Sequence, residues 1–178
     1  MSTTELRAPI LAALHRVLKP AGFGKAAAVF SRQSGDVVHL IELQGSRSNS
    51  SAEARFTVNV GIFAPAIVYP DVRDVRKPSI AGSHWRERLG SLSPEREDVW
   101  WKVSSRTQAD SAVADIAHRV SAYALPALAE LPDLAALVAL WKSGRSPGIT
   151  KGQRADYLAR VAGGANSTRN EIPNALDR

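Results

Sequence analysis

Cysteine is absent from the 178 residues of this chain. Disulfide bonds and thiolate chemistry are therefore excluded, and the cytoplasm is the compartment that we expect. No stretch approaches the ~18 consecutive apolar residues that a membrane-spanning helix needs. The N-terminus also lacks the basic flank and apolar segment of a secretory signal, so we expect neither secretion nor insertion into a membrane.

A concentrated charge of one sign is also lacking, although the formal net charge is +6. Basic side chains are scattered from Arg7 to Arg178, and the densest stretch, residues 73–88, is interrupted by Asp74 and Glu87. A diffuse positive charge affects solubility and non-specific attraction more than it marks a binding surface. Because no nucleic-acid-binding motif accompanies it, we expect no nucleic-acid partner.

The composition fits one compact domain, because 44% of the residues are hydrophobic and the chain is long enough to bury a core. We predict an α+β fold, with an antiparallel sheet of about four strands, an N-terminal helix, and C-terminal helices packed on one face of the sheet. The single domain is expected at residues 1–162, with the first helix and the sheet at 5–103 and further helices at 107–162. A loosely ordered tail should follow at 163–178.

The N-terminal helix is predicted from a capping motif and an apolar stripe. Ser2 and Glu5 have the spacing of a capping box, and apolar residues then recur at helical spacing as far as Val17. Pro9 lies inside this pattern and favours a regular helix that begins nearer Ala8.

Further helix starts are predicted in the second half of the chain. Ser93 followed by Pro94 has the order of an N-cap and a first helical residue. Thr107 can cap a later helix, and Thr150 with Gln153 predicts another capping box.

The strands are predicted from alternating side chains. In residues 55–63 every second position is apolar, which is the period of a strand with one buried face. Residues 27–32 and 37–44 predict two more strands, which would form an antiparallel meander with the first. Residues 98–103 predict a fourth strand, in which Trp100 and Trp101 point to opposite faces.

Polar side chains on these apolar strands form a first candidate site, which consists of Gln44, Ser46, Thr57 and Asn59. Antiparallel pairing across the loop at residues 45–53 can place Gln44 and Asn59 on a common face, depending on a register that the sequence leaves open. The alternative is that the amides satisfy backbone groups at a sheet edge or under a loop.

Tryptophan and arginine form a second candidate site, which consists of Trp85, Arg86, Arg88 and Trp100. Arginine and tryptophan together are frequent in interfaces, and arginine can bind a carboxylate or phosphate while it stacks on a ring. The alternative is that the tryptophans fill the core and the arginines lie over them.

Motifs for metal binding, cofactor binding and nucleophilic catalysis are not found. No two of the four histidines have the spacing of metal ligands, so we expect no metal and no cofactor, and His84 is expected in a surface loop. The glycines and the lysine of residues 144–151 stand in the wrong order for a phosphate-binding loop. Neither Ser46 nor Ser83 lies in the context of a nucleophile.

Several short motifs also occur together in a characteristic order. They are Leu-Lys-Pro-Ala-Gly-Phe at 18–23, Val-Val at 37–38 followed by Gln-Gly-Ser at 44–46, Phe-Thr-Val-Asn-Val-Gly at 56–61, His-Trp-Arg-Glu-Arg-Leu-Gly at 84–90, and Trp-Trp at 100–101. In this combination the chain resembles the bacterial family known as domain of unknown function 4304, well over residues 6–101 and loosely beyond them. That family carries no established reaction, so the resemblance implies no particular activity.

Two functional hypotheses remain open. The lack of a complete catalytic constellation favours a non-catalytic module that binds another protein, with bacterial immunity-type proteins as one setting. The alternative is an enzyme, or a binder of a small anion or metabolite, with a pocket on the polar face of the sheet. In that case Gln44, Ser46 and Asn59 would supply hydrogen bonds, and Arg86 or Arg88 would hold an anion.

Overall fold

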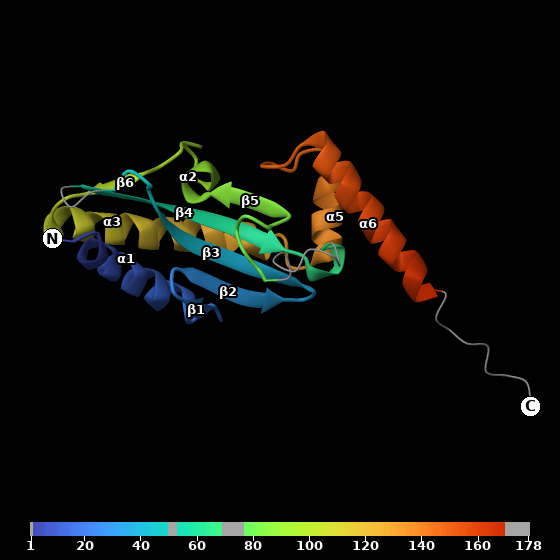
Figure 1. Ribbon diagram of the computed structural model, residues 1–178, viewed down its shortest axis with the longest axis horizontal. Coiled ribbons are helices and arrows are strands. Elements are labelled where there is room, and N and C mark those ends of the chain that lie inside the picture. Colours follow the sequence, from blue (N-terminus) through green and yellow to red (C-terminus); the bar gives the residue numbers. More distant parts are fainter. Residues whose placement is uncertain (1, 50–52, 69–76, 170–178) are drawn as a thin grey trace, which may run out of the picture.

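The computed structural model describes residues 2–49, 53–68 and 77–169, in which helices cover one face and one end of an antiparallel sheet (Figure 1). The strands are β1 (Gly24–Ala26), β2 (Val29–Ser34), β3 (Val37–Gly45), β4 (Ala54–Phe63), β5 (Trp85–Arg88) and β6 (Trp101–Val103). The helices are α1 (Thr3–Leu18), α2 (Leu89–Leu92), α3 (Arg106–Arg119), α4 (Leu125–Ala129), α5 (Leu134–Lys142) and α6 (Lys151–Arg169), with a 3₁₀ turn η1 (Pro65–Ile67) and a π-helical turn η3 (Val120–Ala124). The predicted α+β class is confirmed.

The strands β1 to β5 follow the order of the chain across the sheet, each antiparallel to its neighbour. β6 pairs with the first residues of β4, and β5 pairs with later ones, so both lie on the side of β4 that β3 leaves open. β1 and β5, which were not expected, span only three and four residues. Strands this short show no alternation that a sequence pattern could reveal.

The hydrophobic core lies between one face of the sheet and the helices α1 and α3. Figure 1 shows α3 running behind β3 and β4. The alternating apolar residues of β4 are fully buried, and they share a hydrophobic cluster with Leu6, Ile10 and Leu14 of α1 and Ile116 of α3. Helices α5 and α6 lie beyond one end of the sheet, where α6 extends away from the body (Figure 1).

Helix α1 begins at Thr3, so the expected start near Ala8 is wrong. The predicted capping box is present, because the Glu5 amide donates to Ser2 Oγ at 3.3 Å and the Ser2 amide donates to Glu5 Oε2 at 2.6 Å. Leu6 and Ile10 are buried in the core on either side of Pro9. Capping and burial of this first part of the helix outweigh the one hydrogen bond that proline removes.

The helix predicted after Ser93 and Pro94 does not form. Ser93 ends α2 instead, and its hydroxyl donates to the Gly90 carbonyl at 2.7 Å. Arg96 has a φ of 54°, which no right-handed helix allows. The following segment folds back over Gly90 so closely that a β-carbon there would lie 2.2 Å from the Glu97 carbonyl oxygen. Tertiary packing therefore overrides the local capping signal.

The fourth predicted strand is shorter than expected, because β6 begins at Trp101 and not at residue 98. Trp101 is buried, and its indole N–H donates to Asp115 of α3 at 2.8 Å, whereas Trp100 is half-buried.

The predicted cap of α3 at Thr107 is wrong. The helix is capped by Ser105, whose hydroxyl accepts from the Gln108 amide.

The C-terminal capping box of Thr150 and Gln153 is present, with bonds of 2.9 and 3.1 Å at the start of α6. This helix continues past the expected boundary at residue 162 to Arg169, because Gly163 weakens a helix without stopping it sterically. The rest of the expected tail, residues 170–178, lies outside the described residues. No single helix of the described residues is long and apolar enough to cross a membrane.

Candidate functional site

The strand register brings predicted polar residues onto the sheet face that α1 and α3 leave uncovered. Glu42 of β3 is opposite Asn59 of β4, and Gln44 is opposite Thr57. Asn59 is also opposite Arg88 of β5. Because side chains alternate along a strand, these residues share one face, which we call the outer face. Gln44 and Asn59 thus lie on a common face, which the sequence allowed but did not determine.

An amide network connects the outer-face residues of β3 and β4. The Asn59 side-chain nitrogen donates to Gln44 Oε1 at 2.8 Å and to Glu42 Oε2 at 3.3 Å. Asn59 is 8% exposed, whereas Gln44 is exposed to solvent. The Gln44 amide nitrogen makes no hydrogen bond to any described residue, so it can donate to a ligand.

These side chains line a concave surface, the outer-face groove, with a volume of about 710 Å³. Its wall comes from the loop at residues 79–81 and from β5, and it is lined by Glu42, Gln44, Asn59, Ser79, Ile80, Ala81, Arg86, Glu87, Arg88 and Gly148. The loop can approach the sheet because β4 has a glycine, Gly61, where a β-carbon would lie 2.5 Å from Ser83 Oγ. The volume lies in the range of small-molecule sites.

The two arginines of the groove differ in their partners. Arg88 donates to both oxygens of Asp98 at 2.5 and 2.6 Å, and its guanidinium lies 5.0 Å from the centre of the Trp100 ring. Arg86 makes one long contact of 3.5 Å, to the carbonyl of Ala81, and has no ion pair with a described residue. The charge of Arg88 is therefore neutralised within the protein, whereas that of Arg86 remains open to a ligand.

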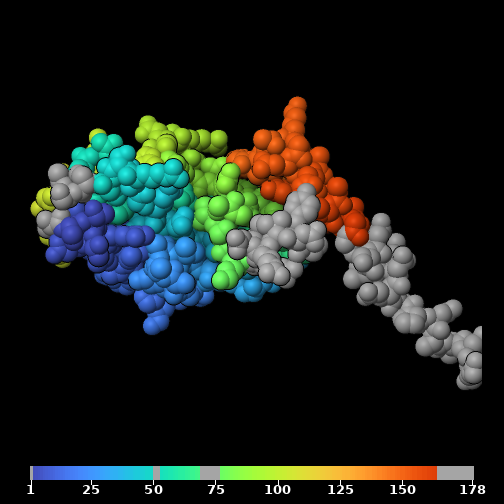
Figure 2. Space-filling model, in the orientation of Figure 1, coloured from blue at the N-terminus to red at the C-terminus, as the bar shows by residue number. Residues whose placement is uncertain are grey.

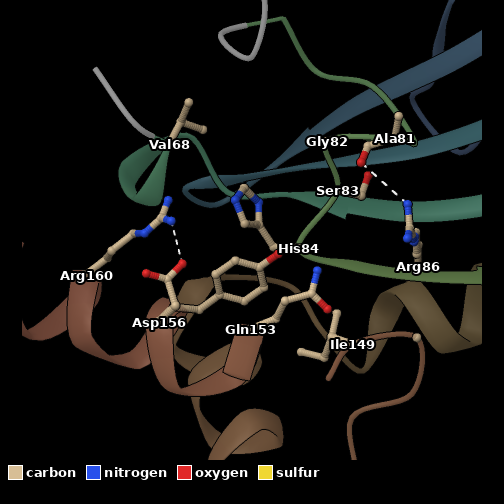
Figure 3. A pocket seen from close by; sticks show the side chains of 12 residues that line it. Val68, Ala81, Gly82, Ser83, His84, Arg86, Ile149, Gln153, Asp156 and Arg160 are labelled. Atoms are coloured by element: carbon tan, nitrogen blue, oxygen red, sulfur yellow. Dashed lines mark hydrogen bonds and ion pairs between the residues drawn. The ribbon is translucent and has the colours of Figure 1, made fainter. Parts of the chain in front are cut away.

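A second cavity of about 460 Å³, the His84 pocket, adjoins the groove at its α6 end (Figure 3). Ala81, Arg86 and Gly148 line both cavities. In the space-filling view, the green segment that carries β5 lies beside the orange C-terminal segment (Figure 2). The two cavities are therefore adjacent, and Arg86 contributes to the lining of both.

His84 is buried in this second cavity, so its expected position in a surface loop is wrong. Its backbone amide donates to the Ile62 carbonyl at 2.8 Å, which ties the end of the loop to β4. The Ala64 amide donates to its Nδ1 at 3.0 Å. Burial, and to a smaller extent the charge of Arg160, lower the pKa of His84 to about 4. The imidazole is therefore neutral at physiological pH.

Helix α6 supplies the far wall of the His84 pocket. Arg160 donates to the Ile67 carbonyl at 2.8 Å, which holds α6 against η1. Its guanidinium also forms an ion pair with Asp156, one helical turn away. Figure 3 shows this pair at one end of the pocket and Arg86 at the other. The charges at the α6 end therefore largely cancel each other.

The other predicted site residues serve the fold and do not line either cavity. Thr57 is buried, and its hydroxyl donates to the Val99 carbonyl at 2.9 Å. Ser46 lies in the turn after β3, where its hydroxyl accepts from the Ser48 amide. Trp85 is buried in the core, since it alternates with Arg86 and Arg88 along β5. Trp100 packs on Arg88. The structure thus brings together only Gln44, Asn59, Arg86 and Arg88.

The sequence patterns missed Glu42, His84 and the α6 residues of the second cavity. Glu42 had a usable signal, because a charged residue inside an apolar strand needs a polar environment. The α6 residues had none, since they lie on an ordinary polar helix far away in the sequence. The described residues contain no cluster of three or more side chains that could hold a metal ion.

The comparisons with known proteins identify a family but no activity. Residues 14–130 match the family model described as Domain of unknown function (DUF4304). The match contains the outer face of the sheet and ends before α5 and α6. No curated protein and no solved structure matches the chain. Because the match covers more than half of the sequence, the chain belongs to the DUF4304 family.

Proposed function

We propose that this chain is a cytoplasmic, non-catalytic binding protein whose outer-face groove holds a small ligand with an anionic group. The observation that carries the proposal is Arg86, an exposed arginine in a concave site without an ion-pair partner among the described residues. An arginine in this position can bind a carboxylate or phosphate with two parallel hydrogen bonds. The free amide nitrogen of Gln44 and the side chain of Asn59 add polar contacts in the same groove.

The absence of a working nucleophile supports binding rather than catalysis. Ser83 is next to His84, but its hydroxyl donates to the Ser79 carbonyl at 2.8 Å and not to a base. The Nδ1 atom of His84 is occupied by the Ala64 amide. Within the described part of the chain, neither cavity joins a nucleophile to a general base by a hydrogen bond.

Thermal-shift screening against organic anions tests the proposal, using the whole chain and an Arg86→Gln variant. A ligand at one hundred times its Kd stabilises a native protein by ~2.7 kcal/mol, which raises the melting temperature measurably. We expect at least one anion to stabilise the wild type and to lose this effect in Arg86→Gln. Arg16→Gln is the matched control, because Arg16 is an exposed arginine of α1 on the helix-covered side of the sheet. Stabilisation that is equal in all three proteins would refute the proposal.

A second candidate function is recognition of a partner protein, for instance in an immunity-type role. It is favoured by the half-exposed Trp100, which is held in place by stacking on Arg88 and by a bond of 3.3 Å to Asp98. Rigid tryptophan and arginine side chains are typical anchors of interfaces. Under this hypothesis, Trp100→Ala should abolish capture of a partner from the native host while the fold stays intact. Retained capture by the Trp100→Ala variant would count against it.

A further inference from the structure

The position of Arg86 at the junction of two cavities restricts what a ligand bound there can look like. On one side of Arg86 lies the polar outer-face groove, and on the other lies the His84 pocket. A ligand whose anionic group contacts Arg86 can therefore extend toward α6. The question is which chemical groups the second cavity can accept.

The His84 pocket offers an uncharged surface next to Arg86. The imidazole of His84 is buried, and the side chain of Ile149 and the edge of the Tyr157 ring lie around it. The ring centres of His84 and Tyr157 are 5.0 Å apart in an edge-to-face arrangement. The guanidinium and carboxylate at the far end are paired with each other. This surface suits an apolar or aromatic group better than a second charge.

The acidic residue Glu42 of the outer face restricts the anionic group itself. Glu42 lines the groove that also contains Arg86. Its carboxylate repels a doubly charged phosphate more strongly than a singly charged carboxylate. A carboxylate carries one negative charge and can still accept two hydrogen bonds from the Arg86 guanidinium, so it combines strong binding with the least repulsion from Glu42.

We propose that the site binds an organic carboxylate, with the carboxylate on Arg86 and an uncharged aromatic or aliphatic body in the His84 pocket. This inference rests on the proposed function and specifies its ligand. A free organic acid and the C-terminal residue of a peptide share this chemistry. The wall that selects the body comes from residues 149–160, which lie outside the family match at 14–130. Selectivity for the body is therefore a property of the C-terminal segment of this chain.

Calorimetric titration of the whole protein with matched probes tests the inference. N-benzoylglycine carries both the carboxylate and the aromatic body, its amide lacks the charge, and acetate lacks the body. We expect saturable binding of N-benzoylglycine, with the amide and acetate weaker by about tenfold or more. Arg86→Gln should weaken N-benzoylglycine by about tenfold or more, whereas Ile149→Ala should weaken it severalfold and leave acetate unchanged. Arg16→Gln should match the wild type, and thermal melts of each variant verify the fold.

A peptide arm separates the two sources of the carboxylate. Acetyl-Ala-Ala-Phe with a free C-terminus is compared with the same peptide as its C-terminal amide. Tighter binding of the free peptide than of N-benzoylglycine assigns the site to peptide C-termini, and the reverse order assigns it to free organic acids; both results support the inference. The inference would be overturned if Arg86→Gln bound N-benzoylglycine as tightly as the wild type does, or if the wild type bound the amide as tightly as N-benzoylglycine. It would also be overturned if no probe saturated the protein up to about 10 mM. If instead an anion without an apolar body binds in an Arg86-dependent way and N-benzoylglycine does not, the inference fails while the proposed function stands.

Discussion

Gly148 packs so closely on Arg86 that a β-carbon at position 148 would lie 2.5 Å from the Arg86 carbonyl oxygen. Gly148 also has a φ of +71°, a conformation that side chains disfavour. The loop before α6 is therefore attached directly to the backbone of β5 at the residue that joins the two cavities. This contact connects the C-terminal helical segment to the candidate site.

Gly148→Ala should destabilise the protein more than Gly144→Ala. Both glycines have nearly the same positive φ, so each alanine should cost about 1–2 kcal/mol of unfolding free energy for its backbone conformation. Only position 148 has a close neighbour, since nothing lies within 4 Å of a β-carbon at 144. The clash with Arg86 should add a further 1–3 kcal/mol, roughly the cost of overpacking. Urea denaturation measures the difference, and equal losses in the two variants would contradict the close contact.

The neighbouring tryptophans should differ in their contributions to stability. Trp101 is 8% exposed and donates to Asp115, so Trp101→Ala should cost roughly 3–5 kcal/mol through lost burial and the cavity left behind. Trp100 is half-exposed and packs on the surface residue Arg88, so Trp100→Ala should cost about 1 kcal/mol. Chemical denaturation of the two single variants gives the comparison. A larger loss for Trp100→Ala would reverse the assignment of the buried ring.

Acidification should destabilise the protein through His84. Its pKa is about 4 in the native state against a usual 6.5, because of burial first and the charge of Arg160 second. Between these two pH values the unfolded chain binds a proton at His84 that the native state does not bind. The unfolding free energy should therefore increase from pH 4 to pH 6.5 and stay constant at higher pH. The expected loss on acidification is roughly 2–3 kcal/mol.

His84→Asn should reduce the dependence of stability on pH, because asparagine keeps an acceptor for the Ala64 amide but does not titrate. Burial also lowers the pKa of His39, so part of the slope should remain. His118→Asn is the control, since His118 lies on an exposed part of α3. The measurement is a series of denaturation curves from pH 4 to 7. An unchanged slope in His84→Asn would show that His84 does not titrate as expected.

His39 should be a structural residue whose loss destabilises the fold without any effect on binding. It is fully buried in β3, where its Nε2–H donates to the Leu131 carbonyl at 2.9 Å and its Nδ1 accepts from Arg32 at 3.1 Å. His39→Phe removes both of these bonds from a fully buried position, although Arg32 keeps its bond to the Ala21 carbonyl, and should cost about 2–4 kcal/mol. His118→Phe should be nearly neutral. Denaturation checks the prediction, and a neutral His39→Phe would show that solvent or other groups replace the lost bonds.

The parts of the chain that sequence patterns predicted correctly depend on neighbours in the sequence. The capping boxes at Ser2 and Thr150 form because a hydroxyl and an amide three residues apart meet in the first turn of any helix. The alternating residues of β4 are buried because a pleated strand with one covered face requires that period. By contrast, the signals at Pro9 and Ser93 were overridden by burial and by close packing on Gly90.

The candidate site was predictable only as a set of residue types. Polar Gln44 and Asn59 on apolar strands, and Arg86 beside a tryptophan, could be singled out by residue type, and all three line the outer-face groove. Their common groove depends on the register of β3, β4 and β5, and a shift by one residue would move each side chain to the other face. That register is set by packing across the whole sheet.

The second cavity was decided by the tertiary structure alone. Its wall exists because Arg160 of α6 binds the carbonyl of Ile67, 93 positions earlier in the chain. His84 is buried, and therefore neutral, because the same distant helix packs against it. Burial and the pKa of a side chain depend on which segments surround it in space, and a local sequence pattern carries no information about such long-range contacts.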